Sequence, residues 1–521
     1  MEDCESCEPC SCLENAEDLP TIITEDRRLP DITNDVLHSL LPFNNLFQRG
    51  GLLCRLRERE PGKLAIEDIN APILKWIMSR CADYRKTQID KLIPPPNFLV
   101  TNILSLSEWP FPYLKGIVTY PVLREDGSLL SEPGYDEASG LYYHPSEDLN
   151  IPEIPEHPTK EDAIQASKLI MEEVFVDFPF ENEASKASAL AGLLSPVVRS
   201  MVDGFVPMML IDKPSPGTGA SLLLEIISLI ATGEVAEMRS PPGTEEEWRK
   251  MITSALREGS NLMFFDNIDA TLKSPSLVRV LTSPKWAERL LGKSEMLSLK
   301  QGTNLYANGN RLAIGGDLSR RCHLAQMDAG MPRPWERDPS LFRHPNIKGW
   351  VKENRGQLLA ALLTMARSWV EAGRPPGTEK VLGSFQEWVE ILGGILSYAG
   401  VSGFLDNLET LYSETDEGND QWQRFFAIWH SIFGDRKVEA KEVVSYLDKA
   451  DHDFSIEAPE EISKAMGGNK AGRVIRVAKA LGKKNKVRYT NGYMLIRHED
   501  TSEKKKLWQL KKYDEAPVVN G

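Results

Sequence analysis

The sequence predicts an α/β fold for the middle of the chain, and three consecutive segments support this prediction. Residues 206–211 are an apolar, strand-like run, and residues 222–230 are apolar and long enough for a helix. Between them stands Pro-Ser-Pro-Gly-Thr-Gly-Ala-Ser, residues 214–221. Glycines at such a place let backbone N–H groups face a phosphate at the start of a helix. Strand, glycine-rich loop and helix in this order are typical of a P-loop that binds a nucleotide.

Each position of this loop has an expected role in holding ATP and Mg²⁺. Ser221 stands where a P-loop hydroxyl binds Mg²⁺, whereas Ala220 stands where the pattern has a lysine that reaches the β- and γ-phosphates. Lys213, just before the loop, is a candidate to supply the missing charge from the other side. We expect position 220 to face solvent, so that the missing lysine weakens hydrolysis without harming the fold. The expected nucleotide-binding residues are Lys213, Pro216, Gly217, Thr218, Gly219, Ala220 and Ser221.

A second strand-like segment, residues 261–266, ends in a carboxylate about 45 residues after the loop. This spacing is usual for a Walker-B strand, whose aspartate holds Mg²⁺ through water. Asp266 and Ser221 are therefore the expected metal-binding pair. Asn267 follows where most such enzymes have Glu, and its amide orients a water molecule but does not accept a proton.

Polar and basic residues after a third strand-like segment, residues 305–310, are candidates for contact with the γ-phosphate. Asn310 is the first choice and Asn308 the second, although both also suit a turn. Arg320 and Arg321 follow shortly and suit an arginine finger that reaches the nucleotide of a neighbouring subunit. The alternative for these two is a surface cluster with Asp317. Three further arginine candidates for that interface are Arg333, Arg337 and Arg343.

Charge is unevenly distributed over the 521 residues. The net charge is −15, but residues 464–512 hold 15 Lys and Arg against three acidic residues. A basic module on an acidic body predicts one local surface for a polyanion, rather than nucleic acid over the whole protein. No apolar run reaches the length of about 18 residues that a membrane span needs, and no secretory signal is present. We therefore expect a cytoplasmic protein without a membrane partner.

Composition shifts divide the chain into five predicted parts. They are an acidic, Cys-rich leader (1–28), an α+β domain (29–158), an α/β nucleotide-binding core (159–345), a helical region (346–432) and a basic winged-helix domain with its tail (433–521). In the leader, Cys4, Cys7, Cys10 and Cys12 have a spacing that suits zinc or an iron–sulfur cluster. The alternative is a flexible tail that carries thiols.

The basic module is the predicted DNA-binding part. Three helix-like segments precede two strands around Asn491-Gly492, a strong hairpin turn, and this order fits a winged helix. The expected phosphate contacts are Arg473, Arg476, Lys483, Lys484 and Lys486, unless these form a solvated basic face. Lys293, near the tip of a hairpin within residues 286–300, is a further candidate for DNA contact, although an exposed lysine in a turn is commoner.

Taken together, these segments resemble a family of AAA+ helicases from prokaryotic phages, plasmids and mobile islands, related to superfamily III and MCM-type replicative helicases. The resemblance covers about residues 90–510. Besides the P-loop, it depends on segments that begin at Gly134, Pro242, Phe265, Leu291, Gly316, Arg333, Phe342 and Ala372. It implies an AAA+ P-loop core, a homo-hexameric ring, hydrolysis of ATP between subunits, translocation on single-stranded or forked DNA, and a primase or polymerase partner. It also implies that Asn267 is normal for the family and that Ala220 is a departure.

The departure at Ala220 leaves several interpretations. The first is an active ATP-dependent DNA helicase whose hydrolysis is impaired and would rise sharply in an Ala220→Lys variant. The second is a non-hydrolysing, nucleotide-binding DNA scaffold or initiator subunit. A third is an alanine introduced to trap a nucleotide state. A transcriptional repressor of a different class would need the winged helix but not the strand-end asparagines and paired arginines.

Overall fold

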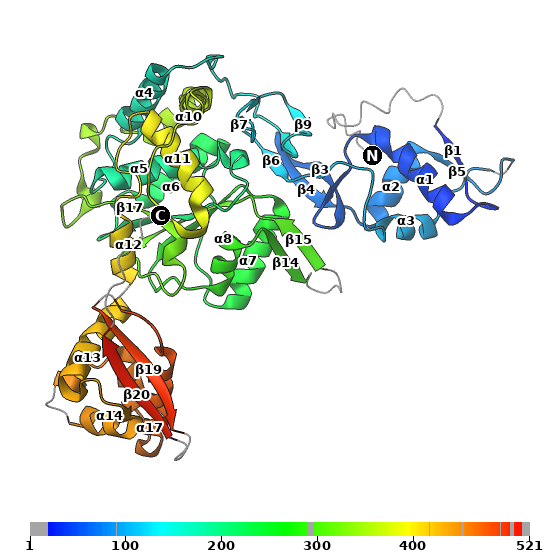
Figure 1. Ribbon diagram of the computed structural model, residues 1–521. Helices are drawn as coiled ribbons and strands as arrows, with labels where there is room; N and C mark the ends of the chain where they lie inside the picture. The colour runs from blue at the N-terminus through cyan, green and yellow to red at the C-terminus, as the bar shows by residue number, and fades with distance from the viewer. Residues whose placement is uncertain are drawn as a thin grey trace. The chain divides into compact units, whose positions relative to one another are not determined.

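The chain forms two compact units, residues 1–409 and 410–521 (Figure 1). The computed structural model describes residues 19–512 except 90, 290–295, 416, 450–452, 490 and 501–504. The four cysteines of the leader and Lys293 lie outside the described residues. The boundaries near residues 29, 159, 346 and 433 stay predictions.

The N-terminal part of the first unit combines three helices with short strands. Its elements are β1 (Thr21–Ile23), α1 (Leu29–Leu40), β2 (Phe47–Arg49), β3 (Leu52–Glu60), β4 (Lys63–Asp68), α2 (Ala71–Cys81), β5 (Asp83–Arg85), α3 (Asn97–Leu104), β6 (Gly116–Val118), β7 (Val122–Leu123), β8 (Leu129–Leu130), β9 (Gly134–Asp136) and β10 (Leu141–Tyr143). Gly50 and Gly51 both have positive φ, 60° and 86°, as a two-residue hairpin turn requires, and β2 pairs with β3 across them.

A five-stranded parallel sheet forms the middle of the first unit, so the α/β prediction is confirmed. The strand order is β12-β13-β16-β11-β17. The strands are β11 (Met208–Lys213), β12 (Met238–Arg239), β13 (Leu262–Ile268), β16 (Asn304–Asn310) and β17 (Cys322–Gln326). The helices of this part are α4 (Lys160–Leu169), α5 (Glu183–Leu194), α6 (Ala220–Thr232), α7 (Glu245–Glu258) and α8 (Pro275–Thr282), and β14 (Lys285–Arg289) pairs with β15 (Met296–Lys300).

The helices that follow complete the first unit. They are α9 (Ile347–Glu353), α10 (Arg355–Glu371), α11 (Gln386–Tyr398) and α12 (Leu408–Thr415), which crosses the boundary between the units. Close backbone contact explains one glycine on α10, because a Cβ on Gly356 would come within 1.7 Å of the Asn150 carbonyl oxygen. Any larger residue there would force α10 away from this segment.

Two buried arginines bind the carboxyl ends of helices in this unit. Arg355 donates to the carbonyls of Ile230 (3.1 Å) and Ala231 (2.9 Å) at the end of α6. Arg49 does the same at α7, donating to the carbonyls of Leu256 and Arg257. A cation at a helix C-terminus satisfies carbonyls that lack an intrahelical partner and opposes the helix dipole.

Replacing Arg355 with Met should lower the free energy of unfolding of the first unit by about 3 kcal/mol, because two charge-assisted hydrogen bonds to buried carbonyls are lost. Urea unfolding followed by tryptophan fluorescence measures this change. Arg367→Met on the same helix is the matched control, since Arg367 makes one hydrogen bond near the surface. Equal midpoints for the two variants would contradict the capping role of Arg355.

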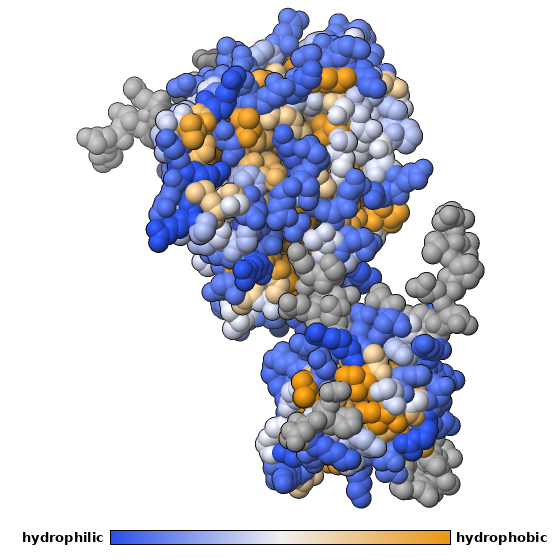
Figure 2. Space-filling view, turned by 90° about the vertical axis from the view of Figure 1, so that its left-hand side faces the viewer, coloured by the Kyte–Doolittle hydropathy of each residue, from blue (hydrophilic) through white to orange (hydrophobic). Residues whose placement is uncertain are grey.

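The second unit packs around an aromatic core. Its elements are α13 (Glu417–Phe433), β18 (Val438–Glu439), α14 (Ala440–Leu447), α15 (Asp453–Ile456), α16 (Glu460–Met466), α17 (Arg473–Lys483), β19 (Tyr493–Asp500) and β20 (Lys505–Lys512). The core gathers Trp422, Phe425, Phe426, Trp429, Phe433 and Phe454 from α13 and α15. Figure 2 shows apolar side chains together on one face of this unit, with polar side chains around them.

The sheet of the second unit differs from the expected hairpin. A turn is present at Asn491-Gly492, but among the described residues only two isolated bridges, Asn485↔Leu495 and Arg488↔Met494, join the segments beside it. The long antiparallel ladder joins β19 to β20, and β18 pairs with the other edge of β20. The prediction missed β20, because its Lys-rich sequence hides the alternation that buries Trp508 and Leu510.

Candidate nucleotide site

The glycine-rich loop joins the end of β11 to the start of α6. Gly217 and Gly219 have φ of 79° and 109°, a region that only glycine adopts without strain. Within the described part of the chain, the backbone N–H groups of Gly217, Thr218 and Gly219 have no hydrogen-bond acceptor. These donors lie at the N-terminus of a 13-residue helix, where an anion is favoured by both the free N–H groups and the helix dipole.

The strand order explains which side chains meet at this loop. Strand β16 lies between β11, which carries the loop, and β13, which carries Asp266. Because the three strands are parallel, their carboxyl ends lie at the same edge of the sheet. The Ser221 hydroxyl donates to Asp266 Oδ1 at 2.9 Å. The structure therefore brings together the two residues expected to bind Mg²⁺.

Lys213 completes a polar network at this edge. Its side chain is buried, and its ammonium donates to Asn308 Oδ1 at 3.0 Å. The Asn308 amide lies 3.5 Å from Ser221 Oγ, which links Lys213 to the Ser221–Asp266 pair. Burial lowers the pKa of Lys213, while the nearby carboxylates of Asp266 and Asp212 act in the opposite direction. An ammonium held in this way lies close to the pair expected to bind Mg²⁺.

The expectation that position 220 faces solvent was wrong. Ala220 is only 1% exposed, as the first residue of α6. The reason is that α6 packs against the sheet from its first turn, so the methyl group of Ala220 is covered. A longer side chain would have to extend along the loop to reach the phosphates.

Asn267 has a backbone role that the sequence analysis did not anticipate. Its φ is +57°, and the β13–β16 register shifts between Phe265 and Ile268, so Asn267 occupies an irregularity in the strand. Asn enters this left-handed region more readily than Glu or Ala, since its short amide bonds to nearby backbone. Its side chain is exposed, which leaves it free to face a ligand.

Two substitutions separate the backbone role of Asn267 from a chemical one. Asn267→Ala should lower the free energy of unfolding by about 1 kcal/mol, whereas Asn267→Gly should leave it nearly unchanged, because glycine accepts positive φ. Thermal unfolding measures both. If Asn267 also orients water, the glycine variant would keep its stability and lose ATP turnover. Equal stability of the two variants would rule out the backbone role.

The two asparagines of β16 lie in different environments. Asn308 is fully buried in the network with Lys213, while Asn310, the first choice from sequence, is exposed at the strand end. Asn308 therefore has the better geometry for coupling the loop to Asp266. Asn308 was the second choice from sequence.

The paired arginines both contact Asp317, as the surface-cluster alternative requires. Arg321 forms an ion pair with Asp317 at 2.7 Å and is mostly buried. Arg320 also pairs with Asp317, but 68% of its side chain is exposed, so it is the more accessible of the two for a neighbouring molecule. Arg343 pairs with Glu173 at 2.7 Å.

Trp335 and Arg337 lie against the loop, a contact that sequence reasoning missed. A Cβ on Gly217 would come within 3.0 Å of the Trp335 side chain, so a larger residue at position 217 would crowd Trp335. Arg337 donates to the carbonyl oxygens of Thr218 and Asp177, both at 3.2 Å. Arg337 thus supports the loop of its own chain, and its expected place at a subunit interface stays a prediction.

The basic residues of the second unit have unequal availability. Arg476 donates to the carbonyls of Ala465, Gly467 and Asn469, and Arg473 pairs with Asp448 at 2.7 Å. Lys484 lies 5.2 Å from the centre of the Trp422 ring. Lys483 and Lys486 are exposed. These last two are the most available of the five for a phosphate.

Comparisons with known proteins give only distant similarities. No protein-family model matches the chain, and neither does any curated protein. The apo C-terminal region of NrS-1 matches with a TM-score of 0.39 and 13% identity, over 91% of this chain and 98% of that chain. SCCmec type IV Cch, described as an active helicase, matches with a TM-score of 0.37 and 10% identity, over 89% and 92%. At these TM-scores the similarities establish neither fold nor function for this chain.

Two kinds of feature are absent from the described residues. Every described helix is too short or too polar to cross a membrane. No three His, Cys, Asp or Glu residues of the described ranges are grouped as a metal site would need.

Proposed function

We propose that this chain is a DNA-dependent ATPase of the helicase type, which binds ATP and Mg²⁺ at the loop between β11 and α6. The observation that carries the proposal is the meeting of Ser221, Asp266 and Lys213 beside N–H groups without acceptors. Hydroxyl, carboxylate, ammonium and free amides are the groups that a bound magnesium triphosphate needs.

The residues present fit that ligand. Ser221 and Asp266 would hold Mg²⁺, and the N–H groups of residues 217–219 would hold the phosphates. Bound Mg²⁺ neutralises charge that develops between the β- and γ-phosphates during transfer. Lys213 supplies the positive charge that Ala220 lacks, with Asn308 orienting its ammonium.

Hydrolysis in this proposal is slow compared with that of an ATPase with the usual lysine. Asn267 and Asn310 place the attacking water but do not take up its proton. Arg320 is the residue that would reach the nucleotide of the next subunit in a homo-hexameric ring, with Arg321 fixing its position through the shared Asp317. DNA would be bound through the phosphates, by Lys483 and Lys486 and by Lys293, and the ring would work beside a primase or polymerase.

Steady-state ATP turnover with and without single-stranded DNA tests this function. We expect Mg²⁺-dependent turnover that rises with DNA, together with rings in single-particle images. The absence of turnover at every Mg²⁺ and DNA concentration would contradict the proposed ATPase function.

A second function, a nucleotide-binding DNA scaffold or initiator without hydrolysis, is favoured by Ala220 alone. It predicts tight binding of ATP with Mg²⁺ and DNA, ring assembly and no turnover. Turnover and binding measured on one sample therefore separate the two proposals.

A further inference from the structure

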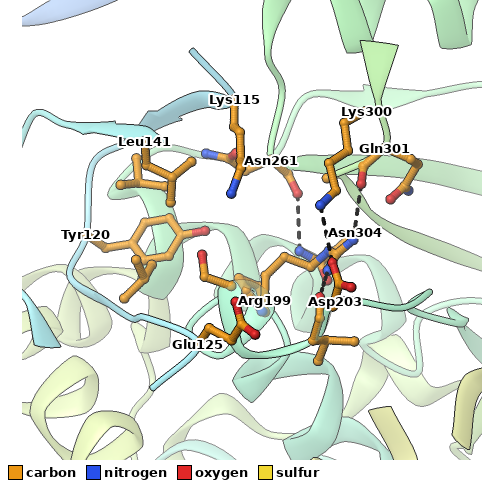
Figure 3. Close-up of a pocket in the computed structure, with 16 residues that line it drawn as sticks. Lys115, Tyr120, Glu125, Leu141, Arg199, Asp203, Asn261, Lys300, Gln301 and Asn304 are labelled. Atoms are coloured by element: carbon orange, nitrogen blue, oxygen red, sulfur yellow. Dashed lines mark hydrogen bonds and ion pairs between the residues drawn. The ribbon is translucent and has the colours of Figure 1, made fainter. Parts of the chain in front are cut away.

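A separate cavity lies at the amino edge of the sheet, the edge opposite the glycine-rich loop, and Figure 3 shows the residues that line it. Its volume is about 120 Å³, several times the ~10–15 Å³ that one water needs. Asn261 and Asn304 lie at the starts of β13 and β16, and Lys300 ends the β14–β15 hairpin. The other wall comes from the segments around β6 and β7 and from the turn that contains Arg199.

Three cationic side chains from separate segments converge on this cavity. Arg199 donates through its Nη atoms to the carbonyls of Val202 and Gln301, which fixes its guanidinium. Its Nε is buried and has no hydrogen-bond partner. Burial lowers the pKa of Arg199 to about 10. Lys115 and Lys300 complete the group.

Lys115 is the cation that the protein compensates least. Within the described residues its ammonium has no hydrogen-bond or ion-pair partner. Burial lowers its pKa first, and Lys300 and Arg199 add repulsion, while Glu125 and Asp203 attract it. Asp203 is already 3.4 Å from Lys300, so its charge is shared.

Neutral groups at the cavity add donors and acceptors. Asn304 Oδ1 is buried without a hydrogen-bond partner. Figure 3 shows the Tyr120 hydroxyl pointing toward the middle of the cavity. Because burial raises the pKa of Tyr120, this hydroxyl keeps its proton and remains a donor.

We propose that this cavity binds a phosphoryl group, which Lys115, Arg199 and Lys300 hold as a second anion site. The phosphate belongs to a DNA strand or to a free nucleotide. The site is independent of the P-loop, because the two lie at opposite edges of the sheet. Lys115 and the Tyr120 hydroxyl would donate to the phosphoryl oxygens.

Binding of two probes by the full chain tests the proposal: fluorescein-labelled oligo-dT by anisotropy, and dTMP by calorimetry. Lys115→Gln should weaken binding about fivefold, because a partly exposed ion pair contributes about 1 kcal/mol to binding. With oligo-dT it should also reduce the slope of log K against log salt by about 0.7, one phosphate contact on a single strand. Lys168→Gln on α4 removes the same charge outside the cavity and should change neither.

Glu125→Gln is the opposite test, because it removes a carboxylate from the rim and should tighten binding several-fold. Weaker binding of both probes by Lys115→Gln supports a site open to free nucleotides, and an effect on oligo-dT alone supports a site for strand phosphate. The proposal is overturned if Lys115→Gln behaves like Lys168→Gln with both probes, if Glu125→Gln tightens neither, or if the unmodified chain binds neither probe.

Discussion

ATP turnover by a Lys213→Met variant should be at least about 100-fold below that of the unmodified chain, because the loss of one well-placed charge from a transition state costs roughly 3 kcal/mol. Methionine keeps the length and apolar stem of lysine, so the packing around β11 is preserved. The buried ammonium is replaced by a group that makes no hydrogen bond to Asn308. A coupled assay of phosphate release measures the change.

The location of the charge is tested by moving it. In the double variant Lys213→Met, Ala220→Lys, the lysine returns to the usual P-loop position, and we expect turnover to recover by at least tenfold. Ala220→Lys alone should raise turnover by less than the roughly 100-fold that one added charge would otherwise give, since Lys213 already lies at the site. Lys168→Met is the matched surface control. A double variant as slow as Lys213→Met would contradict the idea that the two positions share one role.

Asp266→Asn should produce the second large loss, about 100-fold in turnover, together with a rise of at least tenfold in the Mg²⁺ concentration needed for nucleotide binding. The amide of asparagine keeps a contact with Ser221, so the local fold should persist. What would disappear is the negative charge that is proposed to bind the cation and that lies near Lys213. Mg²⁺ titrations of nucleotide binding by fluorescence measure the shift.

Asp269→Asn serves as the control for that experiment, because Asp269 is an exposed carboxylate three residues further along the chain. It should leave both turnover and the Mg²⁺ requirement unchanged. If Asp266→Asn and Asp269→Asn give the same Mg²⁺ dependence, Asp266 does not bind the metal.

The strand–loop–helix segment was predictable because local rules determine it. Apolar runs on both sides of a glycine-rich loop specify a buried strand and a packed helix, and the positive φ of Gly217 and Gly219 follows from residue type. The expected meeting of Ser221 with Asp266 needed only the parallel alignment of strand ends.

Other features depend on contacts that a single sequence does not contain. The insertion of β16 between β11 and β13 places Asn308 within reach of Lys213, and nothing local indicates that strand order. The burial of Ala220 comes from α6 packing on the sheet. Residue type at Asn267 suggested water chemistry, whereas its φ of +57° shows a backbone requirement as well.

The most direct test of the central claim, that Lys213 replaces the lysine missing at position 220, is the affinity of Lys213→Met for two nucleotides. Calorimetry would compare a slowly hydrolysed ATP analogue with AMP, both with Mg²⁺. If the ammonium acts on the β- and γ-phosphates as proposed, triphosphate affinity should fall by at least about tenfold and AMP affinity by less than about twofold. Unchanged triphosphate affinity in Lys213→Met would contradict the account.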